Sequence, residues 1–298
     1  MPIYLGLDCG GSSTRALALN EAGEPKFSGQ GGAANVASTP DRRIRRSLAQ
    51  ACREAPQPDF ICGCFAGLLT PEDRNRAISY IEELFPSAKI FAEPDFAAAL
   101  FASEPGTDIC VVAGTGSLVS SFHDGKVVKS GGRGFILGDE GSAFQYGRDT
   151  FLHYLNNPDS ASAEVKSVIE RVFEFDDEPR ILSKLYRTGS PAMLIAKLAK
   201  ACAVDAHHNV AYAFDSLDRN SDALAGVIHK HIDKFHAGQP KIVISLAGGL
   251  WQSAGIYREK LLEKLGARLP KVEFELNRIK KPPVMGAVQL AIKYSHGH

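Results

Sequence analysis

Hydrophobic and polar positions along the chain follow the same plan twice. An apolar run leads into a turn rich in glycine, serine and threonine, and a second run of alternating apolar and polar positions follows, first at Gly6–Leu19 and again at Ile109–Phe122. Each copy continues through a short hairpin turn, at residues 20–23 and 123–126, into a third strand candidate. The pattern therefore predicts a duplicated unit of three β-strands.

The glycine-rich turns indicate phosphate binding. Glycines let backbone N–H groups point into one small space without a Cβ in the way, which suits a phosphate oxygen. A Rossmann turn or a P-loop needs a helix directly after its glycines, but a strand pattern follows here and the motif GxxxxGK[ST] is absent. An ordinary β-turn is the alternative for either loop alone. The repetition favours a protein that holds a polyphosphate between two such hairpins.

The remaining pattern predicts alternating helices and strands with one helical insertion. Helices are expected near residues 41–54, 71–85, 96–103, 252–265 and 284–294, and buried strands near residues 60–65, 89–92, 241–246 and 272–276. We expect an N-terminal domain over residues 1–105, onto which a C-terminal helix at 284–298 packs back. A C-terminal domain is expected over residues 106–283, with the helical insertion at about 142–236.

Composition narrows the class of partner. The 298 residues are 44% hydrophobic, enough for one large or two medium domains, and we favour two. Basic and acidic residues balance at 34 each, so no overall field favours nucleic acid or an anionic membrane, and a small-molecule partner is expected. No signal sequence and no membrane-spanning run is apparent, which predicts a cytoplasmic protein.

The cysteines and one cluster of arginines are interpreted as structural rather than functional. Six scattered cysteines in a chain of this kind predict reduced, buried thiols rather than disulfides. Four arginines in the helix expected at 41–54 lie mostly off its apolar stripe and are interpreted as a solvated face: Arg42, Arg43, Arg45 and Arg46.

The order of the motifs identifies a family resemblance. The motifs are GLDCGGSST at 6–14, PDFAAAL at 94–100, AGTGS at 113–117, GGRGFILGDEGS at 131–142, LAGGL at 246–250 and PPVMGAVQLA at 282–291. Over nearly its whole length the chain resembles the BadF/BadG/BcrA/BcrD ATPase family of the sugar kinase, Hsp70 and actin superfamily, most closely its N-acetylglucosamine kinase and glucosamine kinase branch. The resemblance implies an α/β fold of two duplicated actin-like (ribonuclease H-like) ATPase domains with a nucleotide cleft between them.

The resemblance also implies which residues bind ATP and Mg²⁺. The first turn would contact the β- and γ-phosphates through Gly10, Gly11, Ser12 and Ser13. Thr115 and Gly116 of the second turn would contact the phosphates from the other side, and Gly248 with Gly249 would let the nucleoside approach the backbone. Asp8 would orient a hydrated Mg²⁺, an ion that keeps most of its waters and needs few carboxylates.

Sugar-binding positions follow from the same resemblance: Asn35, Asp95, Ser117, Gly132, Arg133, Gly134 and Asp139. Asp95 is the candidate general base, because sugar phosphorylation needs a carboxylate that accepts the hydroxyl proton. An N-cap role is its alternative, since Asp95 stands at a helix start. Asp139 would accept hydrogen bonds from neighbouring hydroxyls, or be only a turn residue. For Asn35, a sugar contact and an ordinary loop position are equally open.

Two departures from the family pattern affect which sugar the chain is expected to bind. Related N-acetylglucosamine kinases usually have GGWG and GTGSN, whereas this chain has Arg133 at the tryptophan and Leu118 at the asparagine. If Arg133 points into the sugar pocket, its charge disfavours protonated glucosamine and favours an acidic or acylated sugar.

The sequence thus predicts an ATP-dependent kinase that phosphorylates a hydroxyl of an amino sugar, best matched by N-acetylglucosamine or a close relative. Glucosamine and an N-acetylmuramic-type sugar are alternatives. Two alternatives belong to other functional classes. One is a non-catalytic nucleotide-binding regulator, and the other is the ATPase that activates 2-hydroxyacyl-CoA dehydratases through an iron–sulfur cluster. Cys110 and Cys202 fit that cluster poorly, because Cys110 lies one residue too far from GTG and Cys202 is far along the chain. Monomer and homodimer both remain open.

Overall fold

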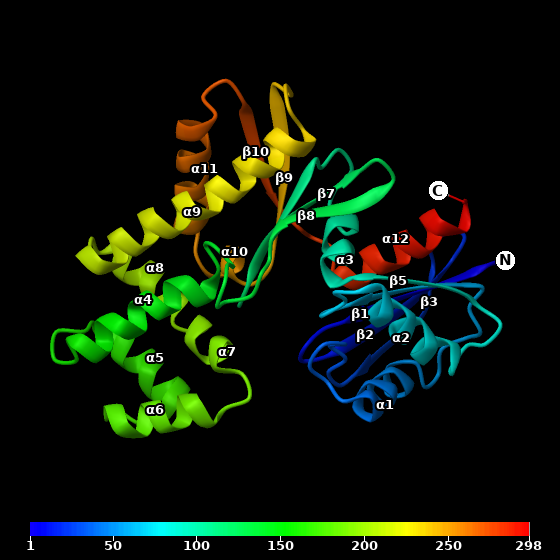
Figure 1. Ribbon diagram of the computed structural model, residues 1–298, viewed down its shortest axis with the longest axis horizontal. Helices are drawn as coiled ribbons and strands as arrows, with labels where there is room; N and C mark the ends of the chain where they lie inside the picture. The colour runs from blue at the N-terminus through cyan, green and yellow to red at the C-terminus, as the bar shows by residue number, and fades with distance from the viewer. Residues whose placement is uncertain (298) are drawn as a thin grey trace. The chain divides into compact units, whose positions relative to one another are not determined.

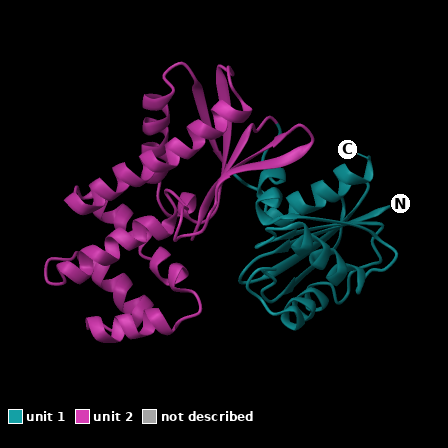
Figure 2. Ribbon diagram, viewed as in Figure 1, with its two compact units in different colours: residues 1–105, 279–298 teal, residues 106–278 magenta. Residues whose placement is uncertain are grey.

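The computed structural model describes residues 1–297, and the chain divides into two compact units (Figures 1 and 2). Unit 1 contains residues 1–105 and the segment that begins at Ile279, and unit 2 contains Gly106–Arg278. The chain therefore leaves unit 1 once, builds unit 2 without interruption, and returns to unit 1 with its last helix.

Each unit is built on one mixed five-stranded sheet. Unit 1 contains β1 (Ile3–Cys9), β2 (Thr14–Asn20), β3 (Pro25–Gly31), β4 (Phe60–Phe65) and β5 (Lys89–Pro94). Unit 2 contains β6 (Ile109–Ala113), β7 (Ser117–His123), β8 (Lys126–Gly131), β9 (Lys241–Ala247) and β10 (Glu273–Arg278). The strand orders are β3-β2-β1-β4-β5 and β10-β9-β6-β7-β8.

The two sheets have the same topology. In each, the first three strands form an antiparallel meander, and the fourth and fifth run parallel to the first. Strands β1 and β6 are equivalent, so the two glycine-rich turns occupy equivalent positions between the first and second strands. The duplication predicted from the sequence is confirmed by this shared strand order, and the fold is α/β.

Four helices complete unit 1: α1 (Asp41–Ala51), α2 (Pro71–Glu82), α3 (Asp95–Phe101) and α12 (Pro283–Ser295). Helix α2 begins with a capping box, in which Thr70 and Asp73 each accept from the other's backbone N–H. Helix α12 packs closely on β1 and α3, because Gly6 and Gly286 leave no side chain between the backbones. The hydrophobic core lies on both faces of the sheet.

Unit 2 carries eight helices: α4 (Ala143–Asn156), α5 (Ala163–Phe173), α6 (Glu178–Arg187), α7 (Pro191–Ala196), α8 (Ala199–His207), α9 (Ala211–Phe235), α10 (Leu250–Ser253) and α11 (Ile256–Arg268). The single helix predicted at 252–265 is wrong. Ala254 is extended (φ −159°, ψ 146°), which ends α10 and lets α11 start in a new direction. The apolar spacing alone does not reveal that break.

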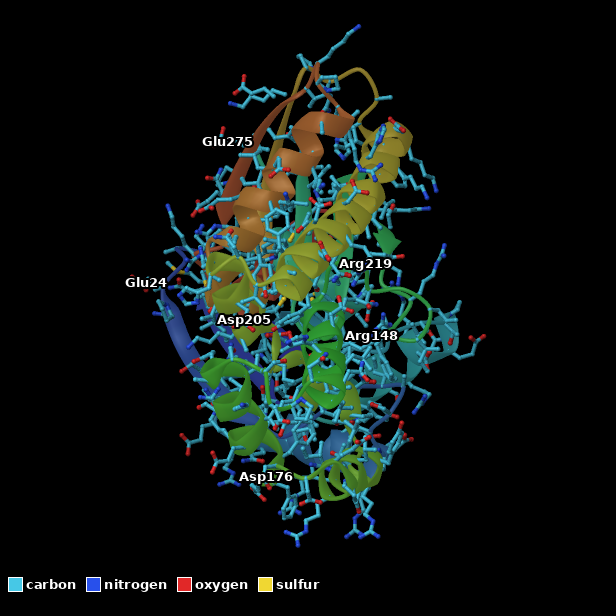
Figure 3. All side chains as sticks on the ribbon, turned by 90° about the vertical axis from the view of Figure 1, so that its left-hand side faces the viewer. Glu24, Arg148, Asp176, Asp205, Arg219 and Glu275 are labelled. Atoms are coloured by element: carbon cyan, nitrogen blue, oxygen red, sulfur yellow. The ribbon has the colours of Figure 1, made fainter. Side chains whose placement is uncertain are left out.

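The predicted helical insertion comprises α4 to α9. It has a hydrophobic core of its own around Phe151, Phe173 and Leu198, separate from the core that covers the sheet. Asp149 of α4 accepts hydrogen bonds from two residues of α9, from Ser216 Oγ (2.6 Å) and from the Arg219 guanidinium (2.7 Å). Arg219 is labelled in Figure 3. The insertion is therefore a packed element rather than a loose appendage.

All six cysteines are free and buried, as the sequence predicts. In the part of the chain that the structure describes, no helix is long and apolar enough to cross a membrane.

Candidate active site

The first glycine-rich turn contains an internal hydrogen bond and is bonded on one side to the segment after β3. Gly10 N donates to Ser13 O (2.9 Å), and Ala34 N donates to Gly10 O (3.0 Å). The Thr14 hydroxyl donates to Gly32 O (2.8 Å). Residues 11–13 are exposed, and a Cβ placed on Gly11 would meet no atom within 4 Å. The turn therefore presents a rigid backbone edge to open space, as a phosphate site requires.

Two carboxylates meet at the edge of the first sheet. Asp8 lies near the end of β1, and Asp95 is the first residue of α3, directly after β5. Because β1, β4 and β5 run parallel, their carboxyl ends lie at the same edge of the sheet. Burial and the charge of Asp95 together raise the pKa of Asp8 from 3.8 to about 6, against the smaller opposing effect of Arg15. Two carboxylates at one edge of a sheet, within electrostatic reach of each other, would suit a hard cation.

The N-cap alternative for Asp95 is not what the structure contains. The N-cap of α3 is Pro94, and a carboxylate oxygen of Asp95 accepts from Phe96 N (2.9 Å). Asp95 is half-buried and lies within electrostatic reach of Asp8. The structure therefore places Asp95 inside the first turn of α3 rather than at its N-cap.

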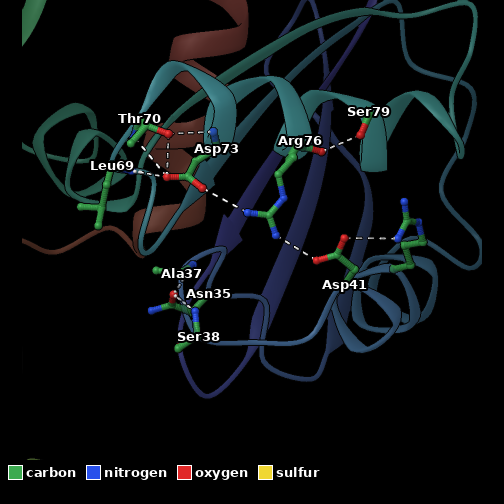
Figure 4. A network of polar contacts seen from close by, with 10 residues as sticks. Asn35, Ala37, Ser38, Asp41, Leu69, Thr70, Asp73, Arg76 and Ser79 are labelled. Carbon is green, nitrogen blue, oxygen red and sulfur yellow. Dashed lines mark hydrogen bonds and ion pairs between the residues drawn. The ribbon is translucent and has the colours of Figure 1, made fainter.

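Asn35 shapes the loop beside the first turn. Its Oδ1 atom accepts from Ala37 N (2.9 Å) and Ser38 N (3.1 Å), which forms a local side-chain turn (Figure 4). The loop interpretation of Asn35 is therefore correct for its oxygen. The Asn35 Nδ2 atom takes no part in these two hydrogen bonds, so it can donate to a ligand.

The second turn is joined to Asp139. Gly114 N donates to Gly116 O (2.8 Å), and a Cβ on Gly116 would lie 2.6 Å from Asp139 Oδ2. The buried Asp139 has a left-handed backbone (φ 58°). Burial raises its pKa, and the backbone N–H groups of Ser117 and Gly134, which donate to the carboxylate, oppose that rise. Two backbone donors leave lone pairs free on the carboxylate for further hydrogen bonds.

The segment between β8 and Asp139 is a glycine loop that needs left-handed backbone at several positions. Gly132 and Gly134 have φ values of 65° and 82°, which residues with a side chain rarely adopt. Arg133 between them is exposed. Leu118, the second departure from the family pattern, packs beneath Gly132, where a Cβ would lie 3.0 Å from the leucine Cβ.

The two predicted nucleotide loops of unit 2 do come together. Gly248 (φ 104°) packs so closely on Ala113 that a Cβ would collide with its carbonyl, which brings the end of β9 to the second turn. Beside them lies a cavity of about 290 Å³ lined by Thr115 and Gly249 and by residues of the insertion and α10. The latter group includes Met193, Lys197, Lys200, Leu250 and Ser253.

Sequence reasoning missed Lys197 and Lys200. They belong to the α7–α8 region, roughly 80 residues after the second turn, and no motif marks them; only folding brings them to this cavity. The predicted residues are otherwise divided between the units. Unit 1 holds Asp8, the first turn, Asn35 and Asp95, and unit 2 holds the rest. No group of three or more His, Cys, Asp or Glu residues arranged for a metal occurs within residues 1–297.

The comparisons with known proteins agree with this architecture. The model of the BadF/BadG/BcrA/BcrD ATPase family matches residues 5–291. The chain belongs to this family. Membership of an ATPase family implies that the chain uses ATP.

Curated relatives match over almost the whole length. An N-acetylmuramic acid/N-acetylglucosamine kinase of Clostridium acetobutylicum is 24% identical over 98% of both chains. An N-acetyl-D-glucosamine kinase of Dictyostelium discoideum is 23% identical over 97% of this chain and 98% of the relative. The crystal structure of a candidate N-acetylglucosamine kinase from Chromobacterium violaceum matches with a TM-score of 0.72 and 22% identity, over 98% of this chain and 99% of that one. This likeness shows the shared two-domain fold.

Proposed function

We propose that this protein is an ATP-dependent kinase that phosphorylates a hydroxyl group of an amino sugar, N-acetylglucosamine or a close relative. The observation that carries the proposal is the pair Asp8 and Asp95, held together at the carboxyl edge of the first sheet beside an open glycine turn. Family membership and the full-length relatives, which are named for amino-sugar kinase activities, support the same reading.

The two carboxylates have different tasks in this proposal. Asp95 accepts the proton of the attacking sugar hydroxyl, because it begins a helix at the sheet edge and does not serve as its cap. Asp8 would hold Mg²⁺, because a hard cation prefers carboxylate oxygens and would compensate the negative charge of this partly buried group. When bound, Mg²⁺ neutralises charge on the β- and γ-phosphates of ATP.

The phosphates of the nucleotide would contact mainly backbone groups. In unit 1, residues 11–13 of the first turn are exposed, and their N–H groups would cradle phosphate oxygens. In unit 2, Thr115 and Gly116 would do the same, and the cavity beside Gly249 would take the nucleoside. Lys197 and Lys200 line that cavity and would add charge near the nucleotide.

The sugar would be recognised by both hydrogen-bond acceptors and donors. Asp139 retains lone pairs for sugar hydroxyls, Asn35 retains its amide nitrogen, and Ser117 is fixed by donating its hydroxyl to Glu140 O (2.7 Å). Arg133, between Gly132 and Gly134, adds an exposed cation to the same loop. This charge favours an N-acetylated or acidic sugar over protonated glucosamine.

The test is sugar-dependent release of ADP from Mg-ATP. N-acetylglucosamine, N-acetylmuramic acid, glucosamine and glucose are each compared with a blank that contains no sugar. We expect stimulation by the N-acetylated sugars and the weakest stimulation by glucosamine. Equal release with every sugar and the blank would contradict the proposal and indicate an ATPase without a sugar acceptor.

The alternative role as a dehydratase activator is disfavoured by cysteine burial. A cluster shared between two subunits needs thiolates at the surface, but Cys110 and Cys202 are both fully buried. Burial also raises the pKa of Cys202 to about 11, which keeps the thiol protonated. Anaerobic reconstitution with iron and sulfide is expected to leave the protein colourless.

A further inference from the structure

The arginines of α1 fall into two groups. Arg45 is engaged, since its Nε donates to Glu83 Oε2 (2.8 Å) and its guanidinium lies 4.6 Å from the centre of the Tyr80 ring. Arg42, Arg43 and Arg46 are exposed, and none of them forms an ion pair with a carboxylate in the described chain. From the sequence alone, these arginines are interpreted as a solvated helix face. That interpretation does not explain why Arg42, Arg43 and Arg46 all line the same cleft.

That cleft lies in unit 1 and has a volume of about 660 Å³. One wall is α1, and the other is the backbone just after β3. Its lining includes Gly32, Pro40, Arg42, Arg43, Arg46 and Ser47. Gly32 keeps the cleft open, because a Cβ at this position would lie 2.9 Å from Ser47 Oγ. A volume in this range is typical of small-molecule sites.

The cleft concentrates positive charge without an internal counterion. Arg42 and Arg46 are four residues apart on the helix, a spacing at which like charges repel. The one acid of the first turn, Asp41, is engaged elsewhere by Arg76 (2.9 Å; Figure 4). Pro40 offers no side-chain cap, so the positive end of α1 also opens here.

We propose that this arginine cleft binds the phosphate dianion of a small molecule. Three guanidinium groups, two on the first turn of α1 and one on the next, suit a tetrahedral oxyanion, because each can donate two parallel hydrogen bonds. The chain as a whole carries no net charge, so the cleft is a local feature and not part of a broad basic surface for nucleic acid or membrane. Free inorganic phosphate and a phosphorylated sugar share this chemistry.

The cleft is separate from the first glycine turn but is connected to it. Ser47 Oγ donates to Ala33 O (2.9 Å), and Ala34 N donates to Gly10 O (3.0 Å). The cleft wall and the proposed nucleotide turn therefore share one short backbone segment. Because the glycine turn would itself take phosphate, it must be filled before binding to the cleft is measured.

The test is calorimetric titration of the full chain saturated with Mg²⁺ and a non-hydrolysable ATP analogue. The probes are inorganic phosphate, N-acetylglucosamine 6-phosphate and unphosphorylated N-acetylglucosamine, at matched ionic strength. The test variant is Arg42→Gln/Arg43→Gln/Arg46→Gln. The control Arg171→Gln/Arg187→Gln/Lys230→Gln removes the same charge from exposed helix positions of unit 2 that form no ion pair within the described residues.

We expect phosphate binding in the wild type and the control, and a loss of about tenfold or more in affinity in the cleft variant. Tighter binding of the sugar phosphate than of inorganic phosphate would identify a phosphorylated sugar as the ligand, and equal affinities would identify free phosphate. Equal phosphate affinity in the wild type and the cleft variant would overturn the proposal. The absence of phosphate binding in the wild type would also overturn it. Thermal unfolding without phosphate checks that the cleft variant is folded.

Discussion

At the scale of single residues, the proposed chemistry depends on two carboxylates with unlike surroundings. Asp8 is largely buried near the end of β1, and its pKa is raised to about 6, while Asp95 begins α3 and supplies part of the charge that raises it. Pairs of carboxylates whose environments differ are a common way to separate a metal-binding role from a proton-accepting role. The family motifs predicted both residues, and the fold places both at the carboxyl edge of the first sheet.

Replacing Asp95 by Asn is expected to lower sugar phosphorylation by about a hundredfold or more, because the amide cannot accept the hydroxyl proton. Binding of ATP is expected to stay within about twofold of the wild type, since the phosphates contact backbone groups. Initial rates with N-acetylglucosamine and calorimetric ATP binding measure the two effects. Glu72→Gln, an exposed carboxylate on α2, is the control and is expected to keep full activity. Unchanged turnover in Asp95→Asn would remove Asp95 from the mechanism.

Asp8 predicts a pH dependence of stability in the metal-free protein. Its pKa is about 6 in the folded state and 3.8 when unperturbed, so between these pH values the folded state holds a proton that the unfolded chain has released. The free energy of unfolding therefore falls as pH rises through this window, by up to about 3 kcal/mol. Urea unfolding at pH 4.5 and pH 7.5 measures the fall.

The variant Asp8→Asn is expected to lose that part of the pH dependence and, without metal, to be more stable than the wild type at pH 7.5. Adding Mg²⁺ at pH 7.5 is expected to stabilise the wild type and to leave Asp8→Asn unchanged. Identical pH slopes in the two proteins would show that Asp8 is not held in a destabilising environment.

At the scale of elements, sequence patterns predicted most strands and helices, because alternation and helix capping are local signals. The boundaries of β4 and the Thr70 cap of α2 follow directly from them. The break between α10 and α11 was missed, since Ala254 carries no breaker signal of its own. The paired and unpaired arginines of α1 look alike in sequence, and only folding brings Arg45 to Glu83, at the C-cap of α2, and to the Tyr80 ring.

Helix α12 gives an element-scale prediction. A Cβ on Gly286 would collide with the Ala98 carbonyl of α3, so Gly286→Ala is expected to force α12 off its neighbours and to destabilise unit 1 by about 2 kcal/mol. Gly266→Ala in α11 is the matched control: no atom lies within 4 Å of its added Cβ, and the change is expected to stabilise by about 0.5 to 1 kcal/mol. Chemical denaturation compares the two. A stabilising Gly286→Ala would contradict the close packing of α12 on α3.

At the scale of the whole molecule, two sheets of identical topology carry two equivalent glycine turns, and the last helix returns to the first unit. The duplication could be predicted because its signal repeats along the sequence. The cavity beside Gly249 could not, because Lys197 and Lys200 reach it only through the packing of the helical insertion. The roles assigned to Asp139, Asn35 and Arg133 remain predictions that depend on the sugar itself.

The central claim is that a phosphoryl group passes from ATP to an amino sugar. The most direct measurement is mass spectrometry of N-acetylglucosamine after incubation with the wild-type protein, ATP and Mg²⁺, with Asp95→Asn run in parallel. We expect the sugar to gain the mass of one phosphate with the wild type and not with Asp95→Asn. ATP hydrolysis that yields inorganic phosphate while N-acetylglucosamine and N-acetylmuramic acid keep their original masses would contradict the claim.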